Sequence, residues 1–188
     1  MNAVFTPTRY KLSVEDYHKL GAAGILNGDS RVELIEGELL EMAPIGSLHA
    51  ATVARLHELF YEQTRDVALV WQQNPVTLQP KSEPQPDLAL LKFRTDHYAH
   101  ALPVAADVLL IVEVSDTTLD YDRGEKLRLY ARHGIPEYWI VDVSAKRLEV
   151  YREPHAKGYT RELEFNAHDI VSPQAMPEAK IAVDQVLS

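Results

Sequence analysis

Hydrophobic and polar positions follow two periods along the chain, and the two periods predict different elements. Apolar residues at helical spacing predict helices over residues 13–24, 47–64 and 122–133. Ser13 is the expected N-cap of the first helix, because its hydroxyl can accept from a backbone N–H of the first turn. Gly134 and Pro136 are expected to end the third helix.

Shorter apolar or alternating segments predict strands. In Val32-Glu33-Leu34-Ile35, alternation places Glu33 on the face opposite Val32 and Leu34. The apolar run Val108 to Val112, followed by Glu113, is typical of a central strand buried on both faces. The expected strands are 31–35, 38–42, 67–73, 76–78, 88–91, 108–114, 137–143, 147–152 and 159–165, and the C-terminal residues predict only loose strand and loop.

Helices and strands alternate in the middle of the chain, and hairpins flank them. This order predicts an α/β (α+β) fold, a mixed sheet covered by helices, with a helix and a β-hairpin at its N-terminal end. The length of 188 residues favours a single domain, 1–188. No segment has the pattern of a signal peptide or approaches the about 20 apolar residues of a membrane helix, so we expect a cytoplasmic protein without a membrane partner.

The amino-acid composition excludes several kinds of functional site. The chain has no Cys, which excludes disulfide scaffolds, thiolate metal sites and cysteine nucleophiles. It has 19 Lys and Arg against 28 Asp and Glu, a net charge of −9. This charge argues against a protein held on nucleic acid mainly by phosphate neutralisation. It suits a protein that gathers carboxylates around a cation.

Carboxylates at strand ends are the candidates for such a site. Glu113 ends the most apolar strand, where a lone carboxylate must be neutral, paired or bound to a cation. Asp87 begins another strand, and Glu33 lies in a third. The three could converge on one Mg²⁺, a cation that one or two carboxylates usually hold. The alternatives are an ion pair for Glu113, a turn or cap for Asp87 and a solvated position for Glu33.

Lys126 would add a positive charge to this site. It lies at the edge of the apolar face of the helix over 122–133 and can point back towards the end of the strand that holds Glu113. A lysine there could orient an attacking water or offset charge on a phosphate; the alternative is a surface lysine. Tyr130 is expected to pack on the sheet, and Asp122 suits a helix cap, with a second cation as the alternative.

The order of these residues resembles a known pattern. Pro86-Asp87 followed by Glu113-Val-Ser115 is similar to the Pro-Asp…(Asp/Glu)-x-Lys signature of the restriction-endonuclease-like superfamily. Segments 33–39, 47–49, 113–118, 122–130 and above all Gly134-Ile-Pro-Glu-Tyr-Trp-Ile-Val-Asp142 resemble the Uma-type family of proposed endonucleases. The resemblance extends from about residue 10 to residue 155.

The resemblance implies a restriction-endonuclease-like fold and roles for single residues. Asp87 and Glu113 would be metal ligands for Mg²⁺ or Mn²⁺, and Glu33 would complete the site. Ser115 departs from the superfamily pattern, which has Lys there, and Lys126 matches a lysine moved to the following helix. His49, Ser115 and Arg123 are candidates for substrate contacts, with a buried structural histidine as the alternative for His49.

Two functions of different classes follow. The first is a metal-dependent endonuclease that hydrolyses phosphodiester bonds in DNA, as a homodimer because cutting both strands needs two sites. The alternative is a catalytically inactive nuclease-fold domain that binds nucleic acid or protein, which the charge of −9 and Ser115 favour. A serine hydrolase built on Ser47 or Ser115 with His49 is disfavoured, because the chain lacks a Gly-x-Ser-x-Gly elbow.

Coordinates can separate these functions. An active site needs the carboxylates of Asp87 and Glu113 close together, with the amine of Lys126 beside them. Binding of DNA by a chain of this charge also needs its basic residues gathered around one cleft. The candidates for that cleft are Lys81, Lys92, Arg94 and Arg123.

Overall fold

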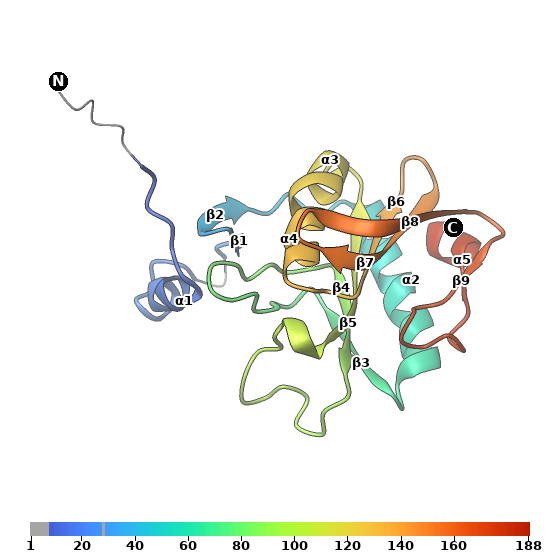
Figure 1. The fold of residues 1–188 in the computed structure, drawn as a ribbon, viewed down its shortest axis with the longest axis horizontal. Helices are drawn as coiled ribbons and strands as arrows, with labels where there is room; N and C mark the ends of the chain where they lie inside the picture. The colour runs from blue at the N-terminus through green and yellow to red at the C-terminus, as the bar shows by residue number, and fades with distance from the viewer. Residues whose placement is uncertain (1–7, 28) are drawn as a thin grey trace. The chain divides into compact units, whose positions relative to one another are not determined.

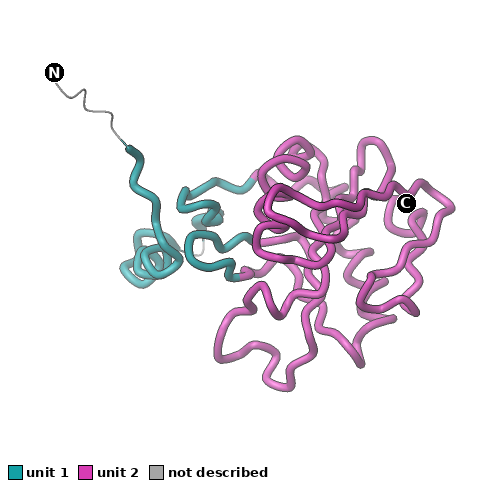
Figure 2. Tube along the Cα trace, in the orientation of Figure 1, with its two compact units in different colours: residues 1–42, 77–84 teal, residues 43–76, 85–188 magenta. Residues whose placement is uncertain are grey.

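A computed structural model describes residues 8–27 and 29–188 (Figure 1). The chain divides into two compact units, coloured separately in Figure 2. We call residues 1–42 with 77–84 the hairpin unit, and residues 43–76 with 85–188 the sheet unit. That the two form one domain over 1–188 stays a prediction.

The hairpin unit contains a helix and a two-stranded sheet. Helix α1 (Val14–Ala22) begins with a capping box, in which the Ser13 hydroxyl accepts from the backbone N–H of Asp16 and the Asp16 carboxylate accepts from that of Ser13. Strands β1 (Val32–Ile35) and β2 (Glu38–Glu41) pair antiparallel. These elements confirm the predicted N-terminal helix and hairpin.

A tight turn joins β1 to β2. Glu36 and Gly37 both have positive φ, 50° and 80°, as two-residue hairpin turns of type I′ require. A Cβ on Gly37 would lie 2.7 Å from Cβ of Lys11, so only glycine fits at this position.

The sheet unit is built on a six-stranded mixed sheet of order β3-β4-β5-β6-β7-β8. Strands β5 and β6 are parallel, and every other neighbouring pair is antiparallel. The mixed sheet flanked by helices confirms the predicted fold class. The strands are β3 (Ala68–Gln72), β4 (Leu88–Lys92), β5 (Val108–Ser115), β6 (Glu137–Asp142), β7 (Arg147–His155) and β8 (Gly158–Asn166).

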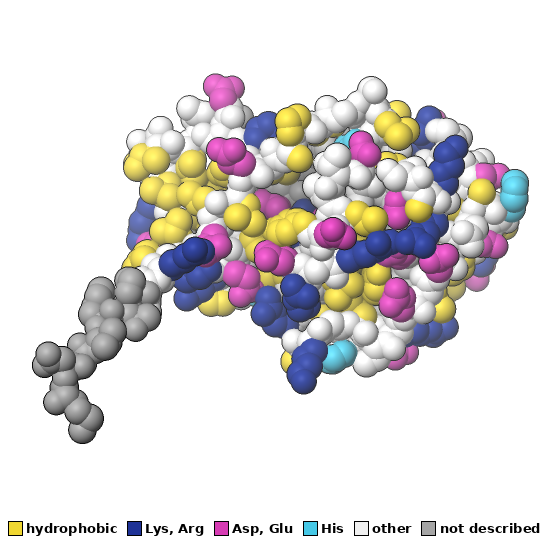
Figure 3. Space-filling model, turned by 90° about the horizontal axis from the view of Figure 1, so that it is seen from above, with side chains coloured by type: hydrophobic (Ala, Val, Ile, Leu, Met, Phe, Trp, Pro, Cys, Tyr) yellow, Lys and Arg dark blue, Asp and Glu magenta, His cyan; other side chains and the backbone are white. Residues whose placement is uncertain are grey.

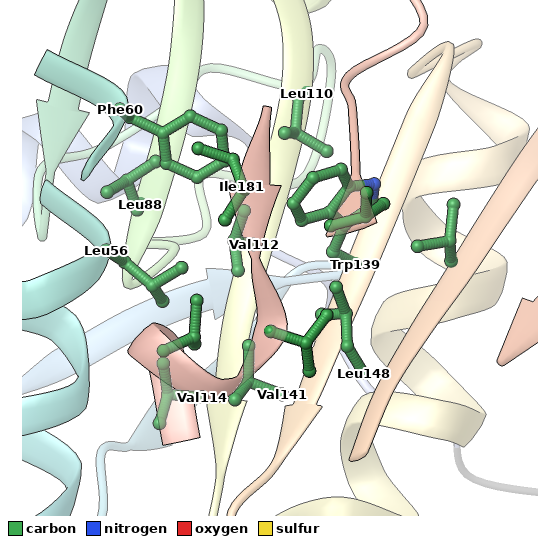
Figure 4. Close-up of a cluster of buried hydrophobic side chains, with 14 of the residues drawn as sticks. Leu56, Phe60, Leu88, Leu110, Val112, Val114, Trp139, Val141, Leu148 and Ile181 are labelled. Carbon is green, nitrogen blue, oxygen red and sulfur yellow. The ribbon is translucent and has the colours of Figure 1, made fainter. Parts of the chain in front are cut away.

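One face of this sheet carries the hydrophobic core (Figure 4). Val112 and Trp139 on the central strands pack there against Leu56 and Phe60 of helix α2 (Ser47–Thr64), and all four side chains are fully buried. The ring centroids of Phe60 and Trp139 lie 5.7 Å apart. The predicted helix over 47–64 is therefore confirmed, and its apolar stripe is the reason that it lies on the sheet.

The opposite face, which we call the polar face, carries buried acidic side chains beside apolar ones such as Ile140, because side chains alternate between the faces along each strand. Register places Glu113 of β5, Ile140 of β6, Glu149 of β7 and Glu164 of β8 in one row. The next row begins with Ser115 and contains Asp142 and Arg147. This face is covered by a helical segment made of α3 (Leu119–Tyr121), η2 (Asp122–Lys126) and α4 (Leu127–Arg132), so α2 and α4 lie on opposite faces (Figure 1).

Two predictions about the helical segment are corrected. It begins at Leu119 rather than at residue 122, which shortens the predicted loop. Its middle, η2, is a π-helical turn rather than an α-helix, in which the backbone N–H of Leu127 donates to the carbonyl of Asp122. Hydrophobic periodicity cannot reveal a π turn, because one such turn changes the spacing by a single residue.

Two other segments differ from the prediction. Residues 76–78 form no strand; Leu78 makes only an isolated bridge to Ser82 across a short turn, which leaves no length for a ladder. The C-terminal residues are more ordered than expected: β9 (Ile170–Val171) pairs with β10 (Ile181–Ala182), and α5 (Val183–Leu187) follows. Val183 and Val186 belong to the core, so tertiary burial stabilises elements too short to be predicted. The 3-10 turn η1 (Ala105–Asp107) precedes β5.

Within the described residues, no helix combines the length and the apolar character needed to cross a membrane.

Candidate active site

Glu113 lies near the end of β5 on the polar face of the sheet, and its side chain is buried. Its Oε1 accepts from Nζ of Lys126 at 2.9 Å and from the hydroxyl of Tyr130 at 2.7 Å. Lys126 is itself only 7% exposed. The structure therefore brings Lys126 and Glu113 together as a buried, hydrogen-bonded pair.

Asp87 lies immediately before β4, which runs antiparallel to β5 with Leu88 opposite Val112. The start of β4 is therefore beside the end of β5. The backbone N–H of Asp87 donates to Oε2 of Glu113 at 3.3 Å, and that of Val114 donates to Oδ2 of Asp87 at 2.9 Å. The backbone of Asp87 thus bonds the carboxylate of Glu113, and the backbone of Val114 bonds the carboxylate of Asp87, which ties the two strand ends together.

His49, in the first turn of α2, reaches the same carboxylate. Its Nε2 lies 2.8 Å from Oδ1 of Asp87, and both side chains are largely buried. The hydrogen bond to Asp87 raises the pKa of His49, against the lowering effect of burial. His49 is therefore connected to the site through Asp87.

The electrostatics of the site are dominated by the burial of Glu113. Loss of solvation raises the pKa of Glu113 to about 8; Lys126 opposes this, while Asp87 and Asp122 add to it. The site therefore favours either a proton or a further positive charge next to Glu113. Such an environment is common where a protein binds a cation or carries out proton chemistry.

Ser115 does not reach the cluster of Asp87, Glu113 and Lys126. Its hydroxyl donates to Oδ2 of Asp122 at 2.7 Å, and the same oxygen accepts from Oγ1 of Thr118 at 2.6 Å. Asp122 is 2% exposed and belongs to the π turn that also holds Lys126. Ser115 thus links β5 to the helical segment.

Arg123 is engaged away from Asp87 and Glu113. Its Nε donates to Oε2 of Glu149 at 3.0 Å, Nη2 bonds the other oxygen of Glu149, and Nη2 also lies 3.4 Å from Oδ2 of Asp142. Both carboxylates are buried, on β7 and β6. Arg123 is therefore held by the sheet at this position.

The predicted basic cleft is not formed by the arginines. Arg94 pairs with Asp96 at 2.6 Å and lies over the ring of Tyr98, while Arg123 pairs with Glu149. Lys81 belongs to the hairpin unit. On the face seen in Figure 3, basic, acidic and hydrophobic side chains are interspersed. The charge argument against tight binding of nucleic acid therefore stands.

The side chains that could act as ligands show whether the site suits a metal ion. Among residues 8–27 and 29–188, no three Asp, Glu or His side chains are grouped so that they could hold a metal ion. The sheet unit supplies the pair Asp87 and Glu113, and one or two carboxylates with water are what Mg²⁺ usually takes. The residues therefore fit Mg²⁺ or Mn²⁺. Glu33 is buried on β1 of the hairpin unit, and its role as a third ligand stays a prediction.

Tyr130 and Asp122 contribute more than the sequence indicated. Tyr130 was predicted to pack on the sheet, and it does, but its hydroxyl also holds Glu113. Its position four residues after Lys126, on the same side of the helix, was the available signal. Asp122 was predicted as a helix cap; it instead lies inside the helical segment and accepts hydrogen bonds from the hydroxyls of Ser115 and Thr118, which both precede that segment.

Comparisons with known proteins identify the family and the fold of the chain. The Uma2 family, described as "Putative restriction endonuclease", matches residues 14–184. The fold is similar to the crystal structure of a "putative nuclease belonging to DUF820" from Anabaena variabilis, with a TM-score of 0.73 and 14% sequence identity. That similarity covers 94% of this chain and 97% of the other. No curated protein matches the chain.

Proposed function

The chain belongs to the Uma2 family, described as "Putative restriction endonuclease", and from this premise we propose that it is a metal-dependent nuclease that hydrolyses phosphodiester bonds in DNA. The observation that carries the proposal is the buried pair of Lys126 and Glu113 beside Asp87. Two carboxylates and one amine at the end of a central strand are the groups that metal-assisted phosphodiester hydrolysis needs.

Asp87 and Glu113 would hold the ion, Mg²⁺ or Mn²⁺. When bound, the ion polarises the phosphate and lowers the pKa of a water molecule. Neighbouring groups orient both carboxylates. The Val114 N–H and His49 hold that of Asp87, and Tyr130 holds that of Glu113.

Lys126 would provide the fixed positive charge of the site. Its ammonium group is held at 2.9 Å from Glu113, where it can orient an attacking water or offset the charge that develops on the phosphate. Burial strengthens either effect, because charges interact more strongly when water is excluded.

The substrate and assembly are further parts of the proposal. DNA is the proposed substrate, and a homodimer would place two such sites on a duplex. The chain's net charge of −9 predicts weak binding that increases when a divalent cation is present.

Cleavage of supercoiled plasmid tests the proposed function. The purified protein is incubated with plasmid in Mg²⁺, in Mn²⁺ or in EDTA, and nicked and linear products are quantified. Cleavage is expected only with the cations, and Glu113→Gln is expected to lower the rate by about 100-fold or more. Glu125→Gln, which removes the same charge from an exposed position in the π turn, is the matched control and should cut at the normal rate.

Other outcomes would contradict the proposal in different ways. Full cleavage by Glu113→Gln would reject the site. Binding of DNA without cleavage by the unchanged protein, with either cation, would support the inactive binding module instead. Cleavage of an RNA of the same sequence, with DNA left intact, would reject DNA as the substrate.

A further inference from the structure

We propose that Arg123 and Asp122 are positioning residues: they anchor the π turn η2 to the sheet so that Lys126 reaches Glu113. The inference rests on the proposed function for the role of Lys126, but its structural part can be tested without it. It also assigns Arg123 a role other than the substrate contact predicted from the sequence.

The residues of η2 contact two acidic side chains of the polar face that lie on different strands. Glu113 of β5 and Glu149 of β7 lie in the same row, separated by Ile140 of β6. Neighbouring strands are about 4.8 Å apart, so the two carboxylates are anchored on strands about 10 Å apart. Lys126 donates to Glu113, and Arg123 donates to Glu149. Two basic side chains that are three residues apart in the sequence thus reach strands that are separated by a third strand.

A π turn makes this span possible. In an α-helix, residues three apart are separated by only about 60° around the axis, because a turn has 3.6 residues. The π turn closes over one more residue, shown by the bond from the N–H of Leu127 to the carbonyl of Asp122, and this widens the separation of Arg123 and Lys126. Their side chains can therefore diverge towards different strands.

The carboxylates that hold η2 each accept several hydrogen bonds. Glu149 is buried, and it accepts from both Arg123 and the hydroxyl of Tyr151, the latter at 2.7 Å. These contacts outweigh the cost of burial, so the pKa of Glu149 is lowered and the pair with Arg123 is ionic at neutral pH. At the start of η2, Asp122 is fixed by Ser115 and Thr118.

Gly124 offers a matched pair of variants within the π turn. A Cβ on Gly124 would meet no atom closer than Nη2 of Arg128 at 3.7 Å, so Gly124→Ala fits and keeps the number of residues in the turn. Deletion of Gly124 removes the extra residue and leaves Arg123 and Lys126 two positions apart, where an α-helix separates them by about 160° around its axis. The deletion variant cannot keep both carboxylate contacts.

The first experiment uses the metal-free protein, so that it does not depend on catalysis. NMR of the side-chain ammonium of Lys126, assigned with Lys126→Met, reports its hydrogen bond, because burial slows exchange with water. We expect the signal to shift towards that of an exposed lysine in Arg123→Gln and in the Gly124 deletion. Gly124→Ala and Arg128→Gln, an exposed arginine of the same helical segment, should leave it unchanged.

Glu149→Gln provides a second route to the same anchor, because it removes the ion pair from the strand side and keeps the side-chain volume. Circular dichroism and thermal unfolding show which variants remain folded, and the NMR comparison uses only those. An unchanged Lys126 signal in folded Arg123→Gln and folded Glu149→Gln would overturn the proposal.

The second experiment separates positioning from substrate contact by kinetics. If Arg123 positions Lys126, Arg123→Gln should lower kcat for plasmid nicking by about 10- to 100-fold and leave KM unchanged. A raised KM with an unchanged kcat would show that Arg123 binds DNA and would overturn the proposal. If the unchanged protein does not cut DNA, the proposed function fails while the NMR result still decides the positioning role.

Discussion

At the scale of single residues, burial of Glu113 governs the chemistry of the site. The carboxylate lies at the end of an apolar strand, where it is hydrogen-bonded by Lys126 and Tyr130. The identity of this residue was predictable from the sequence, because an acidic residue after five apolar ones must find a partner. Lys126 was expected beside it, whereas the hydroxyl contact of Tyr130 was not, since Tyr130 was expected only to pack on the sheet.

The raised pKa of Glu113 predicts a pH dependence of stability. Its pKa is about 8 in the folded protein against 4.5 in the unfolded chain, so the folded state binds the proton more tightly. The contribution of this group to stability is full below about pH 4.5 and is lost as the pH rises through 8. We expect the free energy of unfolding of metal-free protein to fall over this range relative to that of Glu113→Gln. Urea unfolding of both proteins at several pH values measures the difference, and parallel pH profiles would contradict the assignment.

His49 provides a second test at this scale. Its pKa is raised by the hydrogen bond to Asp87, so its contribution to stability is full below its ordinary pKa of 6.5 and declines at higher pH. His49→Gln should therefore cost more stability at pH 5.5 than at pH 8.5. Thermal unfolding of both proteins at the two pH values measures this, and an equal cost at both would show that the imidazole is not charged beside Asp87.

At the scale of elements, the contact between β5 and the helical segment decides whether the site is assembled. The antiparallel pairing of β4 with β5 brings Asp87 to Glu113, and the hydroxyls of Ser115 and Thr118 fix Asp122. The strand ends were predictable because apolar runs define them. The π turn was not, because no residue type marks it and a one-residue change in spacing is invisible to periodicity.

The two hydroxyls on Asp122 are expected to act together. Ser115→Ala and Thr118→Val each remove one donor and should cost about 1 kcal/mol. The double variant leaves a buried carboxylate without either donor and should cost more than the sum of the two. Urea unfolding of the four proteins in a double-mutant cycle measures the coupling, and strict additivity would mean that Asp122 finds another donor.

At the scale of the whole molecule, the acidic net charge and the local ion pairs of the arginines both disfavour tight binding to phosphates. The chain has a net charge of −9, and the arginines expected in a cleft are paired with carboxylates. The pairing of Arg123 with Glu149 depends on the register of three strands and could not be predicted from local pattern. The mixed sheet could be predicted, since it follows from the order of apolar segments.

This charge predicts how the protein binds DNA. In EDTA at physiological salt, we expect binding too weak to detect at micromolar protein, because the net charge of −9 repels the phosphates of DNA. Ca²⁺ should strengthen binding by offsetting the carboxylates of the site, and Glu113→Gln should reduce this gain. Fluorescence anisotropy with a labelled duplex measures both, and tight binding in EDTA would show that the charge argument is wrong.

Asp87, Glu113 and Lys126 together are the proposed metal-dependent nuclease site. The most direct measurement is the rate of plasmid nicking in Mn²⁺ by the unchanged protein, by Lys126→Met and by Glu125→Gln under identical conditions. We predict cleavage by the unchanged protein and by Glu125→Gln, and a rate lower by about 100-fold or more in Lys126→Met. Equal rates in all three proteins would contradict the account.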